Sequence, residues 1–331
     1  MSIVQQSDWK RFITRHPEAH ILQSDEWGKL KSSFNWDAKR LIVGNTGALV
    51  LFKQLPLGFS IAYIPKGPVG DDWNSIWSEV DELCVNHKAV FLKIEPDLWE
   101  SIKNREVENI EGFRKSNQTI QPRNTIVINL NGSESDWLMC MKQKTRYNIR
   151  LAQRKGVKVE YSDDLELFHR MIEVTAHRDK FGVHTYDYYQ RAYNLFYPAG
   201  NSELLVAKYN DMPLSAIMLF VLGKRAWYFY GASNNLERSR MPTYLLQWEA
   251  MRWAARKGCL EYDLWGIPDE RKEVLEENFL KRSDGLWGVY RFKRGFGGEL
   301  RRSTGAWDRI YHPRFYSLYL SYLKMCKINS Y

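Results

Sequence analysis

The sequence predicts an α+β fold made of two successive units with mixed sheets, and three observations support this prediction. The first is an internal repeat, because LIVGNTGALVLFKQLPLGFSIAYIPKGPV at residues 41–69 resembles LVAKYNDMPLSAIMLFVLGKRAWYFYGAS at residues 205–233. The second is that both copies read as three apolar strands separated by two turns, the first with Asn and the second with Gly. The third is that a helix and a further strand follow each copy, an order typical of α+β units rather than of doubly wound parallel sheets.

The helix and the strand that follow each copy share their features. Each helix is amphipathic and carries Trp, and each strand ends in an acid followed by Pro-Asp, in KAVFLKIEPD for the first copy and GCLEYDLWGIPD for the second. Ala48 in ALVLF corresponds to Ser215 in SAIMLF, and Asp97 corresponds to Asp269 at nearly the same offset. The repeat therefore extends from the hairpin to the final strand, as a duplication would produce.

Two helices are expected between the copies. Residues 133–136 (SESD) resemble a capping box, and Gly156 suits the position just after a helix, so a basic helix is expected to open the second unit. A second helical stretch begins at Leu165 and leads to the aromatic segment YDYYQRAYNLFY.

The domain boundaries follow from this order of elements. We predict a first unit formed by residues 1–123 together with 304–331, and a second unit formed by residues 124–303. Because no low-complexity linker separates the halves, we expect them to share a wide interface with a cleft between them.

Composition supports a folded protein with an anionic partner. The 331 residues are 44% hydrophobic and 14% aromatic, which excludes a disordered or fibrous chain. Lys and Arg (48) exceed Asp and Glu (39), and the sequence pI is about 9.2, which favours association with RNA, DNA or an anionic membrane surface.

Cysteine usage and hydropathy bear on the compartment. The four cysteines lie far apart and form neither a C-x-x-C pair nor a His/Cys cluster, so we expect no disulfide framework and no metal site; they are Cys84, Cys140, Cys259 and Cys326. The N-terminus MSIVQQSDWKRF has no apolar signal-peptide region, and no run of about 18 apolar residues occurs. We therefore expect a cytoplasmic protein that does not span a membrane.

The stretch KQKTRYNIRLAQRKGVK at residues 142–158 contains seven basic residues. Four of them recur at i, i+4 and would form one stripe of a helix: Lys142, Arg146, Arg150 and Arg154. Like charges at this spacing repel, so a stripe without interleaved carboxylates favours a polyanionic partner that neutralises it. The alternative is a solvated helix face.

The segment YHPRFYSLYLSYLKMCKI at residues 311–328 is amphipathic, aromatic and basic. One interpretation is a helix in peripheral contact with the inner surface of the membrane. The other is an ordinary terminal helix that packs back onto the first unit.

Several motifs in order make the family recognisable. They are QSDEWGKLK, KTRYNIRLAQRKGV, YFYGASNNLERSRMPTYLLQWEAMRWAARKGCLEYDLWGI and YRFKRGFGGEL. With them the chain resembles, over essentially its whole length, the Fem family of peptidoglycan-bridge aminoacyltransferases. The resemblance implies two tandem GNAT-like (acetyltransferase-type) units and no cofactor. It also implies transfer of an amino acid from aminoacyl-tRNA to the amine of the third stem-peptide residue of a cell-wall precursor, either lipid II or UDP-MurNAc-pentapeptide.

The chain resembles the compact members of this family. Residues 188–208 (YYQRAYNLFYPAGNSELLVAK) pass from helix to strand without room for the coiled-coil arm of other members. Lys31 would correspond to a lysine that binds the diphosphate of a nucleotide-linked precursor, although it also reads as a surface lysine after a packed Trp27. The arginine that partners this lysine is replaced by Tyr186, so lipid II stays open as the acceptor.

The resemblance implies a catalytic lysine at Lys293 in YRFKRGFGG, where an ammonium would stabilise the oxyanion or hold the terminal adenosine phosphate. The alternative for Lys293 is a solvent-facing strand lysine. Tyr230 in YFYGAS matches a substrate-site tyrosine, and Phe292 would stack on the end of the tRNA. Either aromatic residue also fits an alternating strand in the core.

Further substrate-binding candidates lie at the two strand ends of the repeat. Asp263, Trp265 and Gly266 belong to YDLWGI, where the carboxylate would orient the acceptor amine or cap the local backbone. Glu95 in KIEP holds the place where relatives carry Asp, so its charge is kept while its reach differs.

Other classes of function are less well supported by the motifs. We find no G-x-S-x-G elbow, no metal motif among the seven histidines and no coenzyme A loop, since the residue three before Gly295 is Phe292. These absences favour direct attack of an amine on the ester over an acyl-CoA N-acetyltransferase. An aminoacyl-tRNA-dependent transferase acting on proteins or small molecules remains an alternative. A non-catalytic RNA-binding protein would explain the charge but not the motifs.

Overall fold

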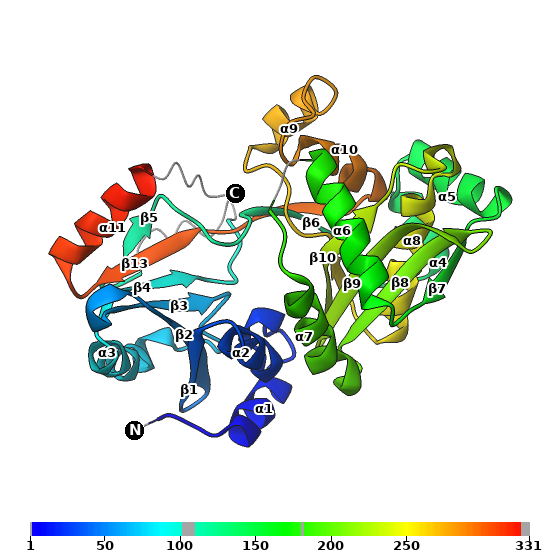
Figure 1. Cartoon of the computed structure of the whole chain (residues 1–331). Helices are drawn as coiled ribbons and strands as arrows, with labels where there is room; N and C mark the ends of the chain where they lie inside the picture. Colours follow the sequence, from blue (N-terminus) through cyan, green and yellow to red (C-terminus); the bar gives the residue numbers. More distant parts are fainter. Residues whose placement is uncertain (1, 101–109, 180–181, 326–331) are drawn as a thin grey trace. The chain divides into compact units, whose positions relative to one another are not determined.

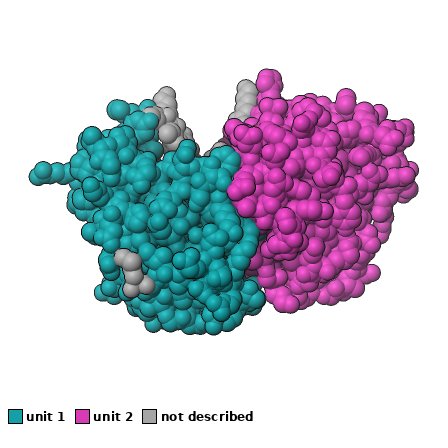
Figure 2. All heavy atoms as spheres, turned by 60° about the horizontal axis from the view of Figure 1, so that its bottom comes forward, with its two compact units in different colours: residues 1–123, 302–331 teal, residues 124–301 magenta. Residues whose placement is uncertain are grey.

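The computed structural model describes residues 2–100, 110–179 and 182–325 (Figure 1). It divides into two compact units, coloured separately in Figure 2: unit 1 is Met1–Arg123 with Arg302–Tyr331, and unit 2 is Asn124–Arg301. The second boundary lies two residues before the one we placed after residue 303. Cys326, one of the four cysteines considered above, lies outside the described residues.

Unit 1 contains a mixed six-stranded sheet. Its strands, in spatial order, are β1 (Trp36–Val43), β2 (Thr46–Gln54), β3 (Ser60–Pro65), β4 (Ala89–Glu95), β13 (Ala306–Ile310) and β5 (Arg114–Ser116). Neighbouring strands are antiparallel except β3 and β4, which are parallel. A parallel pair needs a crossover, and helix α3 (Trp77–Asn86) provides it.

Helices cover both faces of this sheet. The helices of unit 1 besides α3 are α1 (Gln6–Thr14), α2 (Asp25–Ser32) and α11 (Pro313–Met325), with short 3₁₀ turns η1 (Ile21–Gln23), η2 (Pro56–Gly58) and η3 (Trp73–Ser75). Helix α3 packs in one core cluster with Leu92 and Ile94 of β4, while α11 packs in another with Phe91. Because side chains alternate along a strand, Leu92 and Phe91 face opposite sides, so α3 and α11 cover opposite faces.

Unit 2 contains a seven-stranded sheet. Its order is β12 (Glu299–Arg302), β6 (Asn124–Asn129), β11 (Glu261–Asp263), β10 (Arg225–Ser233), β9 (Met212–Leu222), β8 (Ser202–Tyr209) and β7 (Lys158–Tyr161). Strands β10 and β11 are parallel. The pairs β6–β11, β10–β9, β9–β8 and β8–β7 are antiparallel. The sheet is therefore mixed, like that of unit 1.

The helices of unit 2 include the crossover helix and the predicted basic helix. They are α4 (Glu134–Cys140), α5 (Gln143–Arg154), α6 (Leu165–Asp179), α7 (Tyr186–Phe196), α8 (Pro242–Arg256), α9 (Lys272–Asn278) and α10 (Trp287–Lys293), with the 3₁₀ turns η5 (Tyr197–Ala199), η6 (Arg238–Arg240) and η7 (Arg294–Phe296). Five residues separate the end of α7 at Phe196 from the start of β8 at Ser202, so the compact connection expected here is present.

The internal repeat is confirmed by the topology. Strands β1 to β4 and strands β8 to β11 have the same order, and in both sets the last two strands are parallel and joined by a helix, α3 or α8. The predicted α+β class with two mixed sheets is therefore confirmed. In the described residues, no helix is both long enough and apolar enough to cross a bilayer.

One local prediction needs correction. The capping box formed by Ser133 and Asp136 begins α4, a separate short helix, and not the basic helix α5. The chain becomes extended at Met141, whose side chain is buried in the core, and α5 starts only at residue 143. Gly156 does follow the end of α5 with φ of 75°, a conformation that glycine adopts readily.

Candidate active site

Lys293 is a buried lysine at the last residue of α10 in unit 2. Lys293 is only 5% exposed, and its Nζ donates hydrogen bonds to the carbonyl oxygens of Trp265 (3.0 Å) and Gly266 (2.9 Å). Burial lowers the pKa of Lys293 to about 7, and the nearby charge of Asp263 partly opposes this shift. The interpretation as a solvent-facing strand lysine is therefore wrong, because Lys293 lies on a helix and inside the unit.

The two carbonyl groups that accept hydrogen bonds from Lys293 belong to a strained turn after β11. The Oδ1 atom of Asp263 accepts hydrogen bonds from the Trp265 amide (2.7 Å) and from the hydroxyl of Thr125 on β6. Trp265 has φ of 61°, an uncommon conformation for a bulky residue. The carboxylate thus caps the local backbone, and the turn directs the carbonyls of residues 265 and 266 toward Lys293.

Strands β10 and β11 separate beside this turn. They pair only from Arg225 to Trp227 of β10, and the chain after β11 continues toward β6, where the Leu264 amide donates to the carbonyl of Ile126 (2.9 Å). The register of β10 with β9 shifts between Tyr228 and Tyr230, which marks a bulge. Among the described residues, β10 has no strand neighbour on the β11 side beyond this point.

Tyr228, which sequence reasoning missed, is the tyrosine of YFYGAS nearest to Lys293. The Lys293 ammonium lies 5.3 Å from the centre of the Tyr228 ring. Burial raises the pKa of Tyr228 to about 12, so its hydroxyl is neutral at pH 7. Gly231 leaves room for it, because a Cβ atom at residue 231 would collide with the Tyr228 ring. The bulge between Tyr228 and Tyr230 interrupts the regular alternation of side chains along β10, so the sequence alone does not show that Tyr228 lies next to Lys293.

Tyr230 and Phe292, the two predicted aromatic contacts, take part in other clusters. The Tyr230 ring lies edge-on to Tyr189 of α7, with centroids 5.1 Å apart, and burial raises the pKa of Tyr230 well above its usual value. Phe292 packs against Tyr244 and Phe296, with centroids 5.0 and 5.1 Å away. Phe292 lies on a helix and not on the alternating strand that the sequence suggested.

The basic helix α5 starts at the turn that follows Lys293. The amide of Lys142, which caps α5, donates to the carbonyl of Gly295 (2.9 Å). Lys142, Arg150 and Arg154 are exposed, as the predicted stripe requires. Arg146 is partly buried and donates to the carbonyls of Leu138 and Met141 at the end of α4. Arg146 therefore also has a structural role that the i, i+4 spacing does not reveal.

The glycines of FKRGFGG let this turn approach α4 and β6 closely. Gly297 has φ of 81°, and a Cβ atom there would lie 2.5 Å from the carbonyl oxygen of Cys140. We expect Gly297→Ala to destabilise unit 2 by about 2 kcal/mol or more, because both the conformation and the contact are unfavourable for alanine. The control is Gly288→Ala in α10, where the nearest atom is 4.0 Å away and alanine favours the helix. Equal melting temperatures for the two variants would contradict the close approach.

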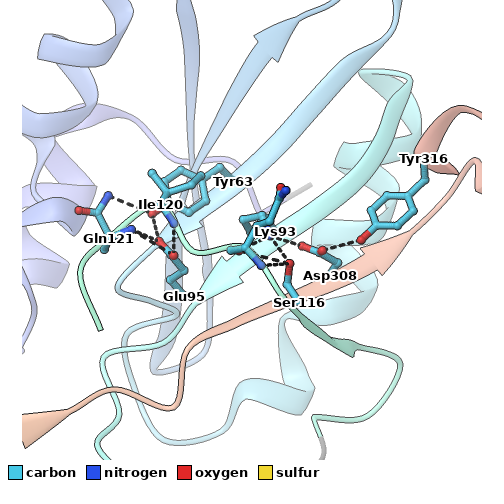
Figure 3. A network of polar contacts seen from close by, with 9 residues as sticks. Tyr63, Lys93, Glu95, Ser116, Ile120, Gln121, Asp308 and Tyr316 are labelled. Atoms are coloured by element: carbon cyan, nitrogen blue, oxygen red, sulfur yellow. Dashed lines mark hydrogen bonds and ion pairs between the residues drawn. The ribbon is translucent and has the colours of Figure 1, made fainter. Parts of the chain in front are cut away.

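Unit 1 contains a second buried network, centred on Glu95 at the end of β4 (Figure 3). Its carboxylate accepts hydrogen bonds from the Tyr63 hydroxyl and from the amides of Ile120 (2.5 Å) and Gln121 (3.1 Å). Burial raises the pKa of Glu95, while these hydrogen bonds and the charge of Lys66 oppose the rise. Glu95 therefore anchors the segment at residues 120–121 beside the buried hydroxyl of Tyr63.

A neighbouring network in Figure 3 holds a buried ion pair that sequence reasoning missed. The Nζ atom of Lys93 lies 2.7 Å from Oδ1 of Asp308 and donates to Oγ of Ser116 (2.6 Å). The Tyr316 hydroxyl donates to the other carboxylate oxygen of Asp308 (2.7 Å). The network joins β4, β5, β13 and α11. A lysine inside the apolar run KAVFLKIE was the available signal.

Lys31, the predicted diphosphate contact, lies in the last turn of α2. Its Nζ is 4.7 Å from the centre of the Trp27 ring. Burial and the charge of Lys53 lower the pKa of Lys31 to about 8. Tyr186, which replaces the partner arginine, begins α7, and its hydroxyl accepts a hydrogen bond from Gln190 (2.9 Å). In the described part of the chain, no group of three or more His, Cys, Asp or Glu is arranged to hold a metal ion.

Comparison with known protein families shows to which family this chain belongs. The model of the FemAB family matches residues 4–120, 109–211 and 201–324, which together span most of the sequence. The chain belongs to the FemAB family. This membership confirms the resemblance to Fem-type transferases and, with it, the expected enzyme class of an aminoacyltransferase.

Relatives of this FemAB protein match it over nearly their whole length. The lipid II:glycine glycyltransferase of Staphylococcus epidermidis is 25% identical over 390 residues, covering 93% of this chain and 92% of that protein. The Staphylococcus aureus protein of the same name is 24% identical over 395 residues, with the same coverage. The crystal structure of FemX superposes with a TM-score of 0.85 at 24% identity, covering 95% of this chain and 98% of FemX. This likeness confirms the fold of two tandem GNAT-like units.

Proposed function

We propose that this FemAB protein transfers an amino acid from aminoacyl-tRNA to the amine of the third stem-peptide residue of a peptidoglycan precursor. Lipid II is the proposed acceptor, because the relatives are named lipid II:glycine glycyltransferases and because Tyr186 replaces the arginine expected with a nucleotide-linked acceptor. The observation that carries the proposal is the buried ammonium of Lys293, placed beside the separation of β10 and β11.

The proposed reaction needs no covalent enzyme intermediate. The acceptor amine attacks the carbonyl carbon of the ribose ester, a tetrahedral oxyanion forms, and the carbon–oxygen bond to the ribose breaks. The ribose oxygen takes the proton that the amine loses, so the products are an amide and a free tRNA hydroxyl. Lys293 uses two of its three ammonium donors on the carbonyls of residues 265 and 266, and the third is suited to the oxyanion. Positioning of the two substrates supplies about 7 kcal/mol or more of the barrier.

The α5 helix is the proposed contact for the phosphates of the tRNA. Its exposed residues Lys142, Arg150 and Arg154 lie on the helix that begins at the turn after Lys293, so donor binding and chemistry fall within one unit. We expect Arg150→Ala to weaken tRNA binding and to lower the salt slope of the binding constant by about one phosphate contact. Arg170→Ala on α6, which removes an exposed pair with Glu166, is the control. If the tRNA-binding isotherms of Arg150→Ala equal those of wild type at every salt concentration, α5 is only a solvated helix face.

Unit 1 is the proposed acceptor side. Lys31 offers a positive charge beside Trp27 for the diphosphate of the precursor. Glu95 positions the segment at residues 120–121 and keeps a buried carboxylate near the Tyr63 hydroxyl, which suits it to orient the acceptor amine. A protein or small-molecule acceptor is the second candidate, and the acceptor assay described in the Discussion distinguishes it.

The donor can be tested by a turnover assay with lipid II and a pool of charged tRNAs. We expect transfer to vanish after ribonuclease treatment and to be indifferent to added coenzyme A, because the motif for its pyrophosphate is missing from the sequence. The control reaction receives heat-inactivated ribonuclease. Turnover with acyl-CoA in the absence of RNA would reject the proposed donor, and RNA binding without any turnover would favour a non-catalytic role.

A further inference from the structure

Helix α11 in unit 1 is apolar on two faces. One face packs on the sheet, where the Tyr316 ring lies edge-on to Phe91 of β4 with centroids 5.0 Å apart and Leu323 is buried. The other face is solvent-exposed and consists of Phe315, Leu318, Tyr322 and Met325. Spacings of three, four and three residues align these four side chains along one side of the helix. A packed terminal helix needs only the first face, so the second requires its own explanation.

The tip of the β2–β3 hairpin extends this exposed surface. Leu57 at the tip is 86% exposed and has φ of 64°, a left-handed conformation that is unfavourable for leucine. The hairpin lies against α11, because the ring of Phe59 packs on Phe315 with centroids 4.4 Å apart. We call Leu57 and the four exposed α11 residues the α11 surface. It combines a helix side with a protruding apolar loop.

The charges around the α11 surface are basic. Helix α11 (PRFYSLYLSYLKM) contains Arg314 and Lys324 but no acidic residue, and His312 precedes it. Apolar and aromatic side chains bordered by cations complement the interface of an anionic bilayer, whose head groups are negative and whose acyl boundary is apolar. A second copy of this chain would instead bring two basic faces together.

We propose that the α11 surface binds this protein to an anionic lipid bilayer. This inference rests on the proposed function in one respect, since a lipid-linked acceptor is presented at a membrane surface. The 13-residue helix would lie in the plane of the interface, with Leu318, Tyr322 and Met325 in the acyl boundary. Leu57 would insert into the bilayer interface at a second point. Arg314 and Lys324 would meet lipid phosphates.

Vesicle flotation tests the surface without any turnover. We expect the wild-type chain to float with vesicles of phosphatidylethanolamine and phosphatidylglycerol, and to float less as salt rises or when phosphatidylcholine alone is used. The double variant Leu318→Ser with Tyr322→Ser should lower the partition coefficient about tenfold or more, and Leu57→Ser should lower it severalfold. The matched control is Leu280→Ser in unit 2, which changes an equally exposed leucine and should not alter flotation.

Three outcomes would overturn the proposal. They are failure of the wild-type chain to float, flotation of the double variant equal to wild type, and a dimer in sedimentation velocity that only the double variant loses. Should the double variant fold poorly by its melting temperature, Arg314→Gln with Lys324→Gln keeps the apolar side chains and should lower flotation with anionic vesicles only. Because no step measures transfer, an inactive protein that floats would reject the proposed function and keep the α11 surface.

Discussion

Lys293→Met is expected to lower the single-turnover rate by about 10²-fold or more at saturating tRNA while the fold stays intact. Methionine keeps a similar length and removes the charge that the oxyanion requires, and the loss of one donor at such a site costs about 10²- to 10³-fold. The control is Lys281→Met in the same unit, whose ammonium is exposed in a pair with Glu277. This control should stay within about twofold of wild type.

The pH dependence distinguishes two roles for the same lysine. Because the pKa of Lys293 is lowered to about 7, its ammonium form predominates below that pH and is lost above it. Deprotonation of the acceptor amine raises the wild-type and variant rates alike as pH rises. We therefore expect the ratio of the wild-type rate to the Lys293→Met rate to fall through about pH 7. A ratio that rises with pH would show that the neutral amine acts as a base.

Lys93→Met is expected to destabilise unit 1 by about 3–5 kcal/mol, the usual penalty for leaving one partner of a buried ion pair alone. The Asp308 carboxylate would remain buried with the Tyr316 hydroxyl as its described side-chain donor. Hydrogen exchange of the β4 and β13 amides measures this effect within unit 1. The double variant Lys93→Met with Asp308→Leu should recover most of the loss, since no charge then stays unpaired.

The outcome that contradicts this role of Lys93 is equally direct. An opening free energy within about 1 kcal/mol of wild type for the single variant would mean that the pair is dispensable. Lys281→Met serves again as the control, because its ion pair is 3.1 Å long but exposed and should contribute about 0.5 kcal/mol or less. Comparing Lys93→Met with Lys281→Met separates the effect of burying an ion pair from the effect of removing one positive charge.

The sequence predicts those features of the fold that depend on local patterns. The hairpins of the repeat are local, so the correspondence of Ala48 with Ser215 located β2 and β9 as equivalent strands. Gly156 likewise marked the end of α5. The break at Met141 was missed, because it depends on burial of that side chain and on the contact of Lys142 with Gly295, which lies far away in the sequence.

The candidate site was predictable in its residues and not in its contacts. Lys293 was recognised through FKRGFGG, but the alternative interpretation placed it on a strand, where the structure has the short helix α10. The hydrogen bonds of Lys293 reach the turn at Trp265 and Gly266, far away in the sequence, so no local pattern predicts them. The role of Tyr228 depends on a bulge in β10, and periodicity alone cannot reveal it.

The most direct measurement of the central claim is mass spectrometry of acceptors after incubation with charged tRNAs. Lipid II and UDP-MurNAc-pentapeptide are offered together, and fragmentation locates any added mass. We predict the increment of an amino acid on the third stem-peptide residue of lipid II, present with intact tRNA, absent after ribonuclease treatment and strongly reduced for Lys293→Met. An increment on UDP-MurNAc-pentapeptide alone would move the acceptor to the nucleotide-linked form. No increment on either acceptor with every charged tRNA would contradict the proposed transfer.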